Sequence, residues 1–443
     1  MAELLSVGLD VGTTSSQMVV SKLSVENKAG VFSVPEMEIA ERKIVYKSPV
    51  YFTPLMGHDL VNGAALRDIV EQEYTRAGIS REDVDTGAVI ITGETSRKEN
   101  AAAVMESLAD LAGDFVVATA GPDLESVLAA KGAGAVEHSA RTGKRVLHFD
   151  IGGGTSNIAL IEDGKITATT CLNVGGRLVK IDRDRRLCYV SPVLRGLFDG
   201  KPGDTADQER LAALAEQLAR VLEMAAGLRE ADEWIDRLET KGIATPACGM
   251  ACNDSKKVIS FSGGVADCID TERNWLDFGD IGPLLGQAIK RSRLCQGDYM
   301  LGAETIRATV IGAGAHSAQL SGSTVFFQNI SFPLKNLAVV ENTGHLSRLD
   351  GPGVLAVRED AADFPAVRAL AEQIAGGADR PVYVAAEQDM AKALGVQLAL
   401  RLGPGAEILC IDRVRLGEGD YLDVGAPIGP ALPVVVKTLV MGK

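Results

Sequence analysis

The sequence predicts an α/β protein with two similar lobes, followed by a further α/β unit. Short β-branched runs alternate with longer Ala/Leu/Glu-rich stretches, which is typical of α/β proteins. An aspartate followed by a glycine-rich turn occurs twice, with the two aspartates 140 positions apart (150 minus 10). The chain has 443 residues, more than one ordinary compact domain, so we expect two or three domains.

The first lobe is predicted to comprise residues 1–143 and to begin with a β-hairpin. Its two apolar strands, 4–10 and 17–23, flank a Gly-Thr-Thr-Ser turn. Further along we expect a buried strand at 88–92, a helix at 99–111 and a strand at 115–118.

The second lobe is predicted to comprise residues 144–320 and to open with a three-stranded meander at 145–151, 157–162 and 165–172. A long helix is expected to start at Thr205, which would form a capping box with Gln208, and to run to Leu238 with a kink at Gly227. Its apolar face would pack on the lobe, and its charged face would be solvated. A strand at 257–261 then enters a Gly-Gly turn.

The last unit is predicted to comprise residues 321–443. It contains a β-branched and aromatic run at 321–327, a stretch rich in turn residues at 342–353 and a helix at 387–401. Two more strands are expected at 408–413 and 434–439.

Charge and hydropathy exclude several classes of partner. The formal net charge is −14, so the average surface repels nucleic acid and anionic membranes. No apolar run reaches the ~18 residues needed to cross a bilayer, and no basic segment precedes an apolar one at the N-terminus. Seven scattered cysteines suit free thiols in a reducing compartment, so a cytoplasmic protein is expected.

The two repeated segments have the chemistry of a nucleotide phosphate site. Glycines let backbone N–H groups approach a phosphate closely, and hydroxyl groups add further donors. Asp10 and Asp150 would repel a phosphate unless a cation lay between, so we expect them to anchor Mg²⁺ through water on opposite sides of a triphosphate. The predicted phosphate-binding residues are Gly12, Thr13, Thr14, Gly152, Gly153, Gly154 and Thr155.

Other interpretations of the repeated segments, and other candidate nucleotide motifs in the sequence, are weaker. A single Asp-x-Gly segment would favour an ordinary hairpin turn, but its duplication in the same strand register favours a clamp. Gly143-Lys144 lacks the upstream glycine of a P-loop, and 312–317 lacks the last glycine of a dinucleotide fingerprint.

Five motifs in order resemble the superfamily of actin, sugar kinases and heat-shock chaperones, whose lobes have a ribonuclease H-like fold. They are two phosphate motifs (10–16 and 150–156), two connecting helices (121–134 and 304–320) and an adenosine loop (262–267). The resemblance implies nucleotide contacts from Gly263 and Gly264, and catalytic roles for Asp10 and Asp150. Chaperone ATPases carry a carboxylate where this chain has Gly121, so either Asp123 substitutes for it or hydrolysis is slow.

The whole chain, including 418–425 and 435–440, also resembles the ethanolamine ammonia-lyase reactivating proteins. That resemblance implies a chaperone-like protein that uses ATP and Mg²⁺ to release inactivated cobalamin from its partner, ethanolamine ammonia-lyase. A bacterial microcompartment is an alternative location, and entry into one stays open. A small-molecule kinase and an actin-like scaffold remain alternatives, and the surface that contacts the lyase and any homo-oligomer stay open.

His148 lies two residues before Asp150 on the same predicted strand. Side chains two apart share a face of a strand. We expect a packed, hydrogen-bonded histidine there in preference to a cobalt ligand.

Overall fold

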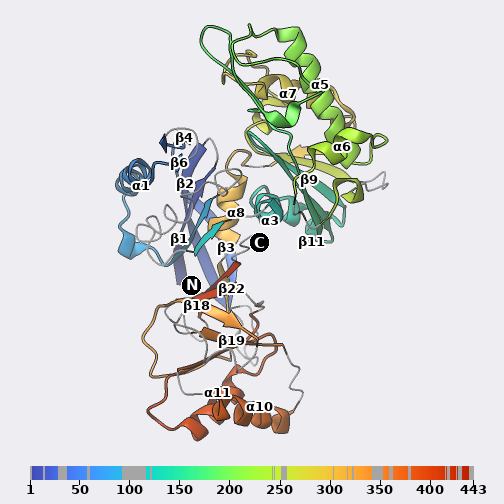
Figure 1. Cartoon of the computed structure of the whole chain (residues 1–443). Helices are drawn as coiled ribbons and strands as arrows, with labels where there is room; N and C mark the ends of the chain where they lie inside the picture. The colour runs from blue at the N-terminus through green and yellow to red at the C-terminus, as the bar shows by residue number, and fades with distance from the viewer. Residues whose placement is uncertain are drawn as a thin grey trace.

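The computed structural model describes most of the chain and contains three main sheets (Figure 1). Two sheets lie side by side in the upper part of Figure 1, and the third lies below them. The described residues are 2–12, 15–27, 37–56, 60–91, 116–119, 122–241, 243, 245–250, 257–302, 304–316, 318–321, 324–341, 353–358, 363–377, 381–414, 416, 420–425, 427 and 432–438.

The first sheet confirms the predicted hairpin and both predicted strands. Its order is β3-β2-β1-β7-β8, with the short β4 paired to β2. β1 and β2 are antiparallel, and β1, β7 and β8 are parallel. The predicted helix at 99–111 lies outside the described residues. The strands are β1 Ala2–Val11, β2 Ser15–Asn27, β3 Met37–Lys47, β4 Tyr51–Phe52, β7 Thr86–Ile91 and β8 Val116–Thr119.

Alternation along β1 gives the first sheet two different faces. Val7, Leu9 and Val11 form an apolar core with Leu66 and other buried residues of helix α1 (Gly63–Ala77). Asp10 is buried on the opposite face, because successive side chains of a strand point to opposite sides. Helix α8 (Ala308–His316) packs on the first sheet against β1, β2 and β7.

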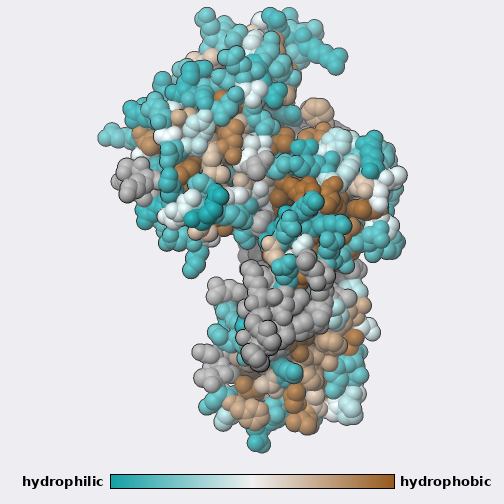
Figure 2. Space-filling view, turned by 180° about the vertical axis from the view of Figure 1, so that it is seen from behind, coloured by the Kyte–Doolittle hydropathy of each residue, from teal (hydrophilic) through white to brown (hydrophobic). Residues whose placement is uncertain are grey.

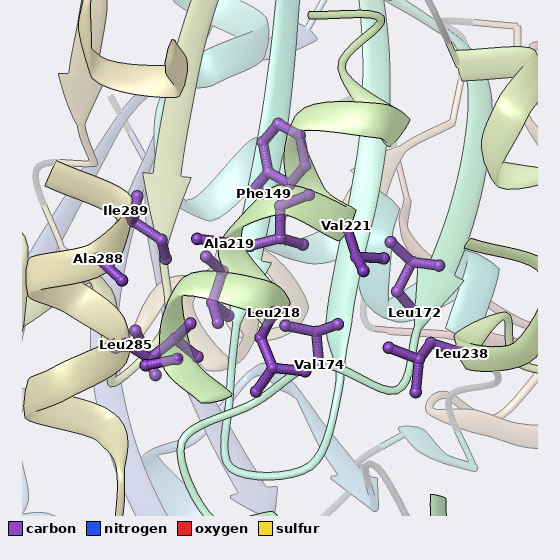
Figure 3. Close-up of a cluster of buried hydrophobic side chains, with 14 of the residues drawn as sticks. Phe149, Leu172, Val174, Leu218, Ala219, Val221, Leu238, Leu285, Ala288 and Ile289 are labelled. Carbon is purple, nitrogen blue, oxygen red and sulfur yellow. The ribbon is translucent and has the colours of Figure 1, made fainter. Parts of the chain in front are cut away.

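The second sheet, of order β11-β10-β9-β14-β15, confirms the predicted meander and the strand before the Gly-Gly turn. Leu147, Phe149 and Ile151 of β9 enter a core with α5 and α7, part of which Figure 3 shows. His148 and Asp150 alternate with them and point to the other face. The elements are β9 Val146–Ile151, β10 Ser156–Glu162, β11 Lys165–Leu172, β14 Val258–Ser262, β15 Tyr299–Leu301, α5 Gln208–Ala225 and α7 Gly282–Arg291.

The prediction of one long helix from Thr205 to Leu238 is wrong, because the helix starts later than predicted and is interrupted. α5 begins at Gln208, and its N-cap is Asp207, whose carboxylate accepts from two backbone N–H groups at 2.9 and 3.2 Å. Gly227 has φ +67°, and α6 (Glu233–Leu238) starts as a separate helix capped by Asp232. The predicted apolar face is buried as expected. Hydrophilic residues predominate at the far end of this lobe in Figure 2.

Two helices cross between the upper sheets. α3 (Pro122–Gly132) follows β8 of the first sheet and packs on β9, β10 and β11 of the second. α8 follows β15 of the second sheet and packs on the first. The second connecting helix is shorter than the predicted range 304–320, because 318–320 form the strand β16. The helix that follows the first sheet, α3, therefore covers the second sheet, and the helix that follows the second sheet, α8, covers the first.

The third sheet has the order β16-β23-β22-β18-β19-β20-β21-β17. Four neighbouring strands, β18 to β21, are parallel, and α10 and α11 connect the last three of them. The predicted helix 387–401 and the later strands are confirmed. The elements are β16 Ala318–Leu320, β17 Phe326–Gln328, β18 Leu334–Val340, β19 Gly353–Val357, α10 Phe364–Gly376, β20 Val382–Ala386, α11 Ala391–Leu402, β21 Ile408–Ile411, β22 Asp420–Val424 and β23 Pro433–Thr438.

The fold is a two-lobed α/β fold with an additional C-terminal α/β unit, as predicted. Within the described part of the chain, none of the helices combines the length and apolar character needed to span a bilayer. The remaining short elements are β5 Leu55–Met56, β6 Leu60–Val61, α4 Ala135–Thr142, β12 Val179–Ile181 and β13 Leu187–Val190.

Asp412, which directly follows β21 of the third sheet, should make stability depend on pH. Its carboxyl group is fully buried, accepts from Thr324 and lies beside Asp389, and burial raises its pKa to about 6. A carboxyl group whose pKa is raised on folding stabilises most below about pH 4, and that stability is lost as pH rises through about 6. Asp412→Asn should therefore stabilise the protein by roughly 1–3 kcal/mol at pH 8 and much less at pH 4. Thermal unfolding at both pH values measures this, and an equal shift at both would contradict it.

Candidate functional site

Asp10 lies near the end of β1, just before the predicted first phosphate loop. Its side chain is 8% exposed. The turn that follows is closed by a hydrogen bond from the Gly12 N–H to the Ser15 carbonyl oxygen, at 2.9 Å. Thr53, next to β4, donates to the Gly12 carbonyl oxygen at 2.7 Å and so supports this loop. Thr13 and Thr14 lie outside the described residues.

Asp150 lies near the end of β9, before a second turn that is closed by the equivalent hydrogen bond. The Gly152 N–H donates to the Thr155 carbonyl oxygen at 2.9 Å, which matches the bond in the first loop. Backbone N–H groups of Gly176 and Arg177 donate to the carbonyl oxygens of Gly152 and Gly153, at 3.0 and 2.6 Å. The internal repeat in the sequence therefore extends to the hydrogen bond that closes each turn.

Two hydroxyl groups hold the Asp150 carboxylate. Ser262 of β14 donates to Oδ1, and Thr309 of α8 donates to Oδ2 at 3.3 Å. Burial raises the pKa of Asp150 to about 6, although both hydroxyl bonds act in the opposite direction. A cation at this carboxylate would favour its ionised form, because an opposite charge offsets the cost of burial.

Each aspartate faces an amide across its hairpin. Gln17 is paired with Asp10 in the β1–β2 register, and Asn157 is paired with Asp150 in the β10–β9 register. The amide nitrogens are engaged, because Gln17 donates to the Ile306 carbonyl oxygen and Asn157 donates to Glu125, both at 2.8 Å. Both amide oxygens are buried and have no hydrogen-bond partner among the described residues. A buried acceptor without a partner is costly, so these oxygens suit a ligand or its water shell.

The predicted adenosine loop lies against the end of β9. Gly263 has φ +86°, and a Cβ atom there would lie 2.3 Å from the Ile151 carbonyl oxygen, so only glycine fits. Its N–H donates to the Thr305 carbonyl oxygen at 2.9 Å. The neighbouring Gly264 approaches the side chain of Ile306. Residues 305–306 therefore contact both the Gly-Gly turn and Gln17 of the first lobe.

A sequence model of the family described as "Ethanolamine utilisation protein EutA" matches residues 2–352 and 350–442. These two segments span nearly the whole chain. The chain belongs to the EutA family.

Two bacterial members of the EutA family resemble the chain over almost its full length. Each bears the name "Ethanolamine ammonia-lyase reactivase EutA" and is 39% identical, with 99% of this chain and 98% of the relative covered. The alignments extend over 464 residues for the protein of Salmonella typhimurium and 467 residues for that of Escherichia coli.

Solved structures resemble the EutA-family chain more distantly. The ethanolamine utilization protein EutJ from Carboxydothermus hydrogenoformans has a TM-score of 0.36 and 18% identity, over 71% of this chain and 90% of that one. The ADPNP-bound activator of the 2-hydroxyisocaproyl-CoA dehydratase from Clostridium difficile has a TM-score of 0.35 and 11% identity, over 71% and 94%. Likeness at this level carries no argument about function.

His148 of this EutA-family chain is a structural residue, as predicted. Its ring is fully buried, and its two nitrogens lie 3.0 Å from the hydroxyl oxygens of Ser260 and Ser262. Burial lowers the pKa of His148 to about 3, so the ring is neutral at physiological pH. Both nitrogens are engaged within β14, which leaves no ring atom for a metal.

Glu125 is the residue of this EutA-family chain that sequence reasoning missed. Asp123, considered as a replacement for the carboxylate absent at Gly121, accepts from Thr169 of β11 at 2.6 Å. Glu125 lies on the same helix, α3, is 6% exposed and accepts from Asn157, the residue opposite Asp150. Glu125 is thus one hydrogen bond from the residue that faces Asp150, whereas Asp123 is bound at β11.

Proposed function

We propose that this chain is an ATP-dependent reactivase that releases inactivated cobalamin from ethanolamine ammonia-lyase. The names of the two EutA relatives support the lyase as the partner. The duplicated aspartate hairpins, joined by crossing helices, support nucleotide binding and a change in the angle between the lobes. The protein would then act wherever the lyase is held, in the cytoplasm or in a bacterial microcompartment.

The observation that carries nucleotide and Mg²⁺ binding is the matched pair of carboxylate and amide groups. Mg²⁺ prefers oxygen ligands and keeps several waters. Asp10 and Asp150 supply negative charge, and Gln17 and Asn157 supply buried amide oxygens with no partner among the described residues. When bound, Mg²⁺ would neutralise the charge of the nucleotide phosphates and anchor them.

The residues of this chain would then bind and orient the nucleotide. Backbone N–H groups of the loops containing Gly12 and 152–154 would donate to phosphate oxygens, and Gly263 and Gly264 would pack near the adenosine. Thr309 of α8 donates to Asp150 of the second sheet, while α8 itself packs on the first sheet. A change at the Asp150 carboxylate would therefore reach the helix that covers the other lobe.

A cofactor-release assay tests this function. Purified ethanolamine ammonia-lyase inactivated with cyanocobalamin should release the cobalamin when this protein, ATP and Mg²⁺ are added, and adenosylcobalamin should then restore lyase activity. Omitting ATP or Mg²⁺ should abolish the release. ATP binding without release would exclude the reactivase function, and phosphorylation of a small substrate would favour a kinase of the same fold.

A further inference from the structure

One side-chain contact bridges the two lobes beside the phosphate loops. The guanidinium of Arg177 lies over the ring of Phe52, 5.4 Å from its centroid. Phe52 belongs to β4 at the edge of the first sheet, and Arg177 precedes β12 of the second lobe. A cation over an aromatic face within about 6 Å is attracted by the ring.

Each half of this contact is anchored to its own phosphate loop. Thr53, adjacent to Phe52, donates to the carbonyl oxygen of Gly12 in the first loop, at 2.7 Å. The Arg177 N–H donates to the carbonyl oxygen of Gly153 in the second loop, at 2.6 Å. A Cβ atom on Gly175 would lie 2.4 Å from that same oxygen, so the second anchor is a tight backbone contact.

The guanidinium of Arg177 is held by an ion pair within its own lobe, whereas the ring of Phe52 is largely exposed. Arg177 Nε lies 3.1 Å from Oδ2 of Asp280, whose side chain is 7% exposed and whose Oδ1 accepts from the Gly282 N–H at 2.8 Å. The ring of Phe52 is 78% exposed, so packing against its own lobe does little to position it. The contact therefore depends on the separation of the lobes.

We propose that Phe52 and Arg177 form a latch that holds the two phosphate loops together and slows nucleotide release. The part that concerns nucleotide rests on the proposed function. The latch itself follows from the contact and its two anchors. Opening the lobes separates the ring from the guanidinium, and Arg177 remains held by Asp280.

Hydrogen exchange of the protein without nucleotide tests the latch alone. Phe52→Ala should speed exchange of the backbone amides of Gly176 and Arg177 about two- to fivefold, which corresponds to the ~0.5–1 kcal/mol of an exposed cation–π contact. Because the ring is exposed, the substitution should not unfold the chain. Phe52→Tyr keeps an aromatic face and should retain the wild-type rate.

Dissociation of N-methylanthraniloyl-ADP in the presence of Mg²⁺ tests the effect on nucleotide. Phe52→Ala should speed release by the same two- to fivefold, and Phe52→Tyr should not. The matched control is Tyr189→Ala, which removes the ring under Lys180 within the second lobe (5.5 Å) and should leave release unchanged.

The outcomes separate the two proposals. Unchanged exchange in Phe52→Ala, or a Phe52→Tyr variant that behaves like the alanine variant, overturns the latch. Wild-type protein that does not bind the nucleotide overturns the proposed function, and the exchange experiment then still decides whether the lobes are latched.

Discussion

Asp150→Asn should weaken Mg²⁺-dependent ATP binding about 10–100-fold, the loss typical of removing a group that holds a bound metal through its outer shell. Asparagine keeps the size of the side chain, its oxygen can accept from Ser262, and its NH2 group can donate to the hydroxyl oxygen of Thr309, which bonds the other oxygen of Asp150. Burial raises the pKa of Asp150, so losing the charge should not destabilise the protein without ligand. Titration calorimetry with ATP, with and without Mg²⁺, measures the effect.

Two further variants make this experiment specific. Asp10→Asn should produce a similar loss, because Asp10 occupies the equivalent place in the first lobe. Asp412→Asn is the matched control, since it removes another buried carboxyl group whose pKa is raised to about 6, but one that directly follows β21 of the third sheet. Wild-type affinity in Asp150→Asn, or an equal loss in Asp412→Asn, would show that the Asp150 carboxylate does not anchor the cation.

The hairpins were predictable because their structure is decided locally. Each has an apolar strand, an aspartate, glycines and a second apolar strand, and these residues determine both the turn and the register. The Gly12 and Gly152 N–H groups accordingly make the same bond in both lobes. The paired amides carried a signal that was overlooked: Gln17 and Asn157 each follow their aspartate by seven positions (17 minus 10 and 157 minus 150).

Other features depend on residues that are distant in sequence. The contact of Glu125 with Asn157 joins positions 32 residues apart, and nothing in the local pattern of α3 distinguishes Glu125 from Asp123. The start of α5 was misplaced because Thr205 and Asp207 are both good N-caps, and the structure uses Asp207. Sequence reasoning therefore recovered the loops but not the polar contacts between the helices and the second sheet.

The crossing of α3 and α8 should not tolerate a single added methyl group. A Cβ atom on Gly312 would lie 2.0 Å from the carbonyl oxygen of Leu128, and one on Gly132 would lie 1.8 Å from that of Ala308. These neighbours are backbone atoms, so a side-chain rotation cannot relieve the clash. Gly312→Ala should cost about 3 kcal/mol, the upper end of overpacking, and lower the melting temperature by about 5–10 °C.

Calorimetry of Gly312→Ala beside Gly376→Ala tests this expectation. Gly376 ends α10, and its added Cβ would meet no atom within 4 Å, so the control should be neutral or more stable by about 0.5–1 kcal/mol. Because α3 packs on the second sheet and α8 on the first, forcing the helices apart should also weaken the coupling between the lobes. If Gly312→Ala melts like the wild type, the helices do not cross this closely, and they could not transmit lobe closure by direct backbone contact.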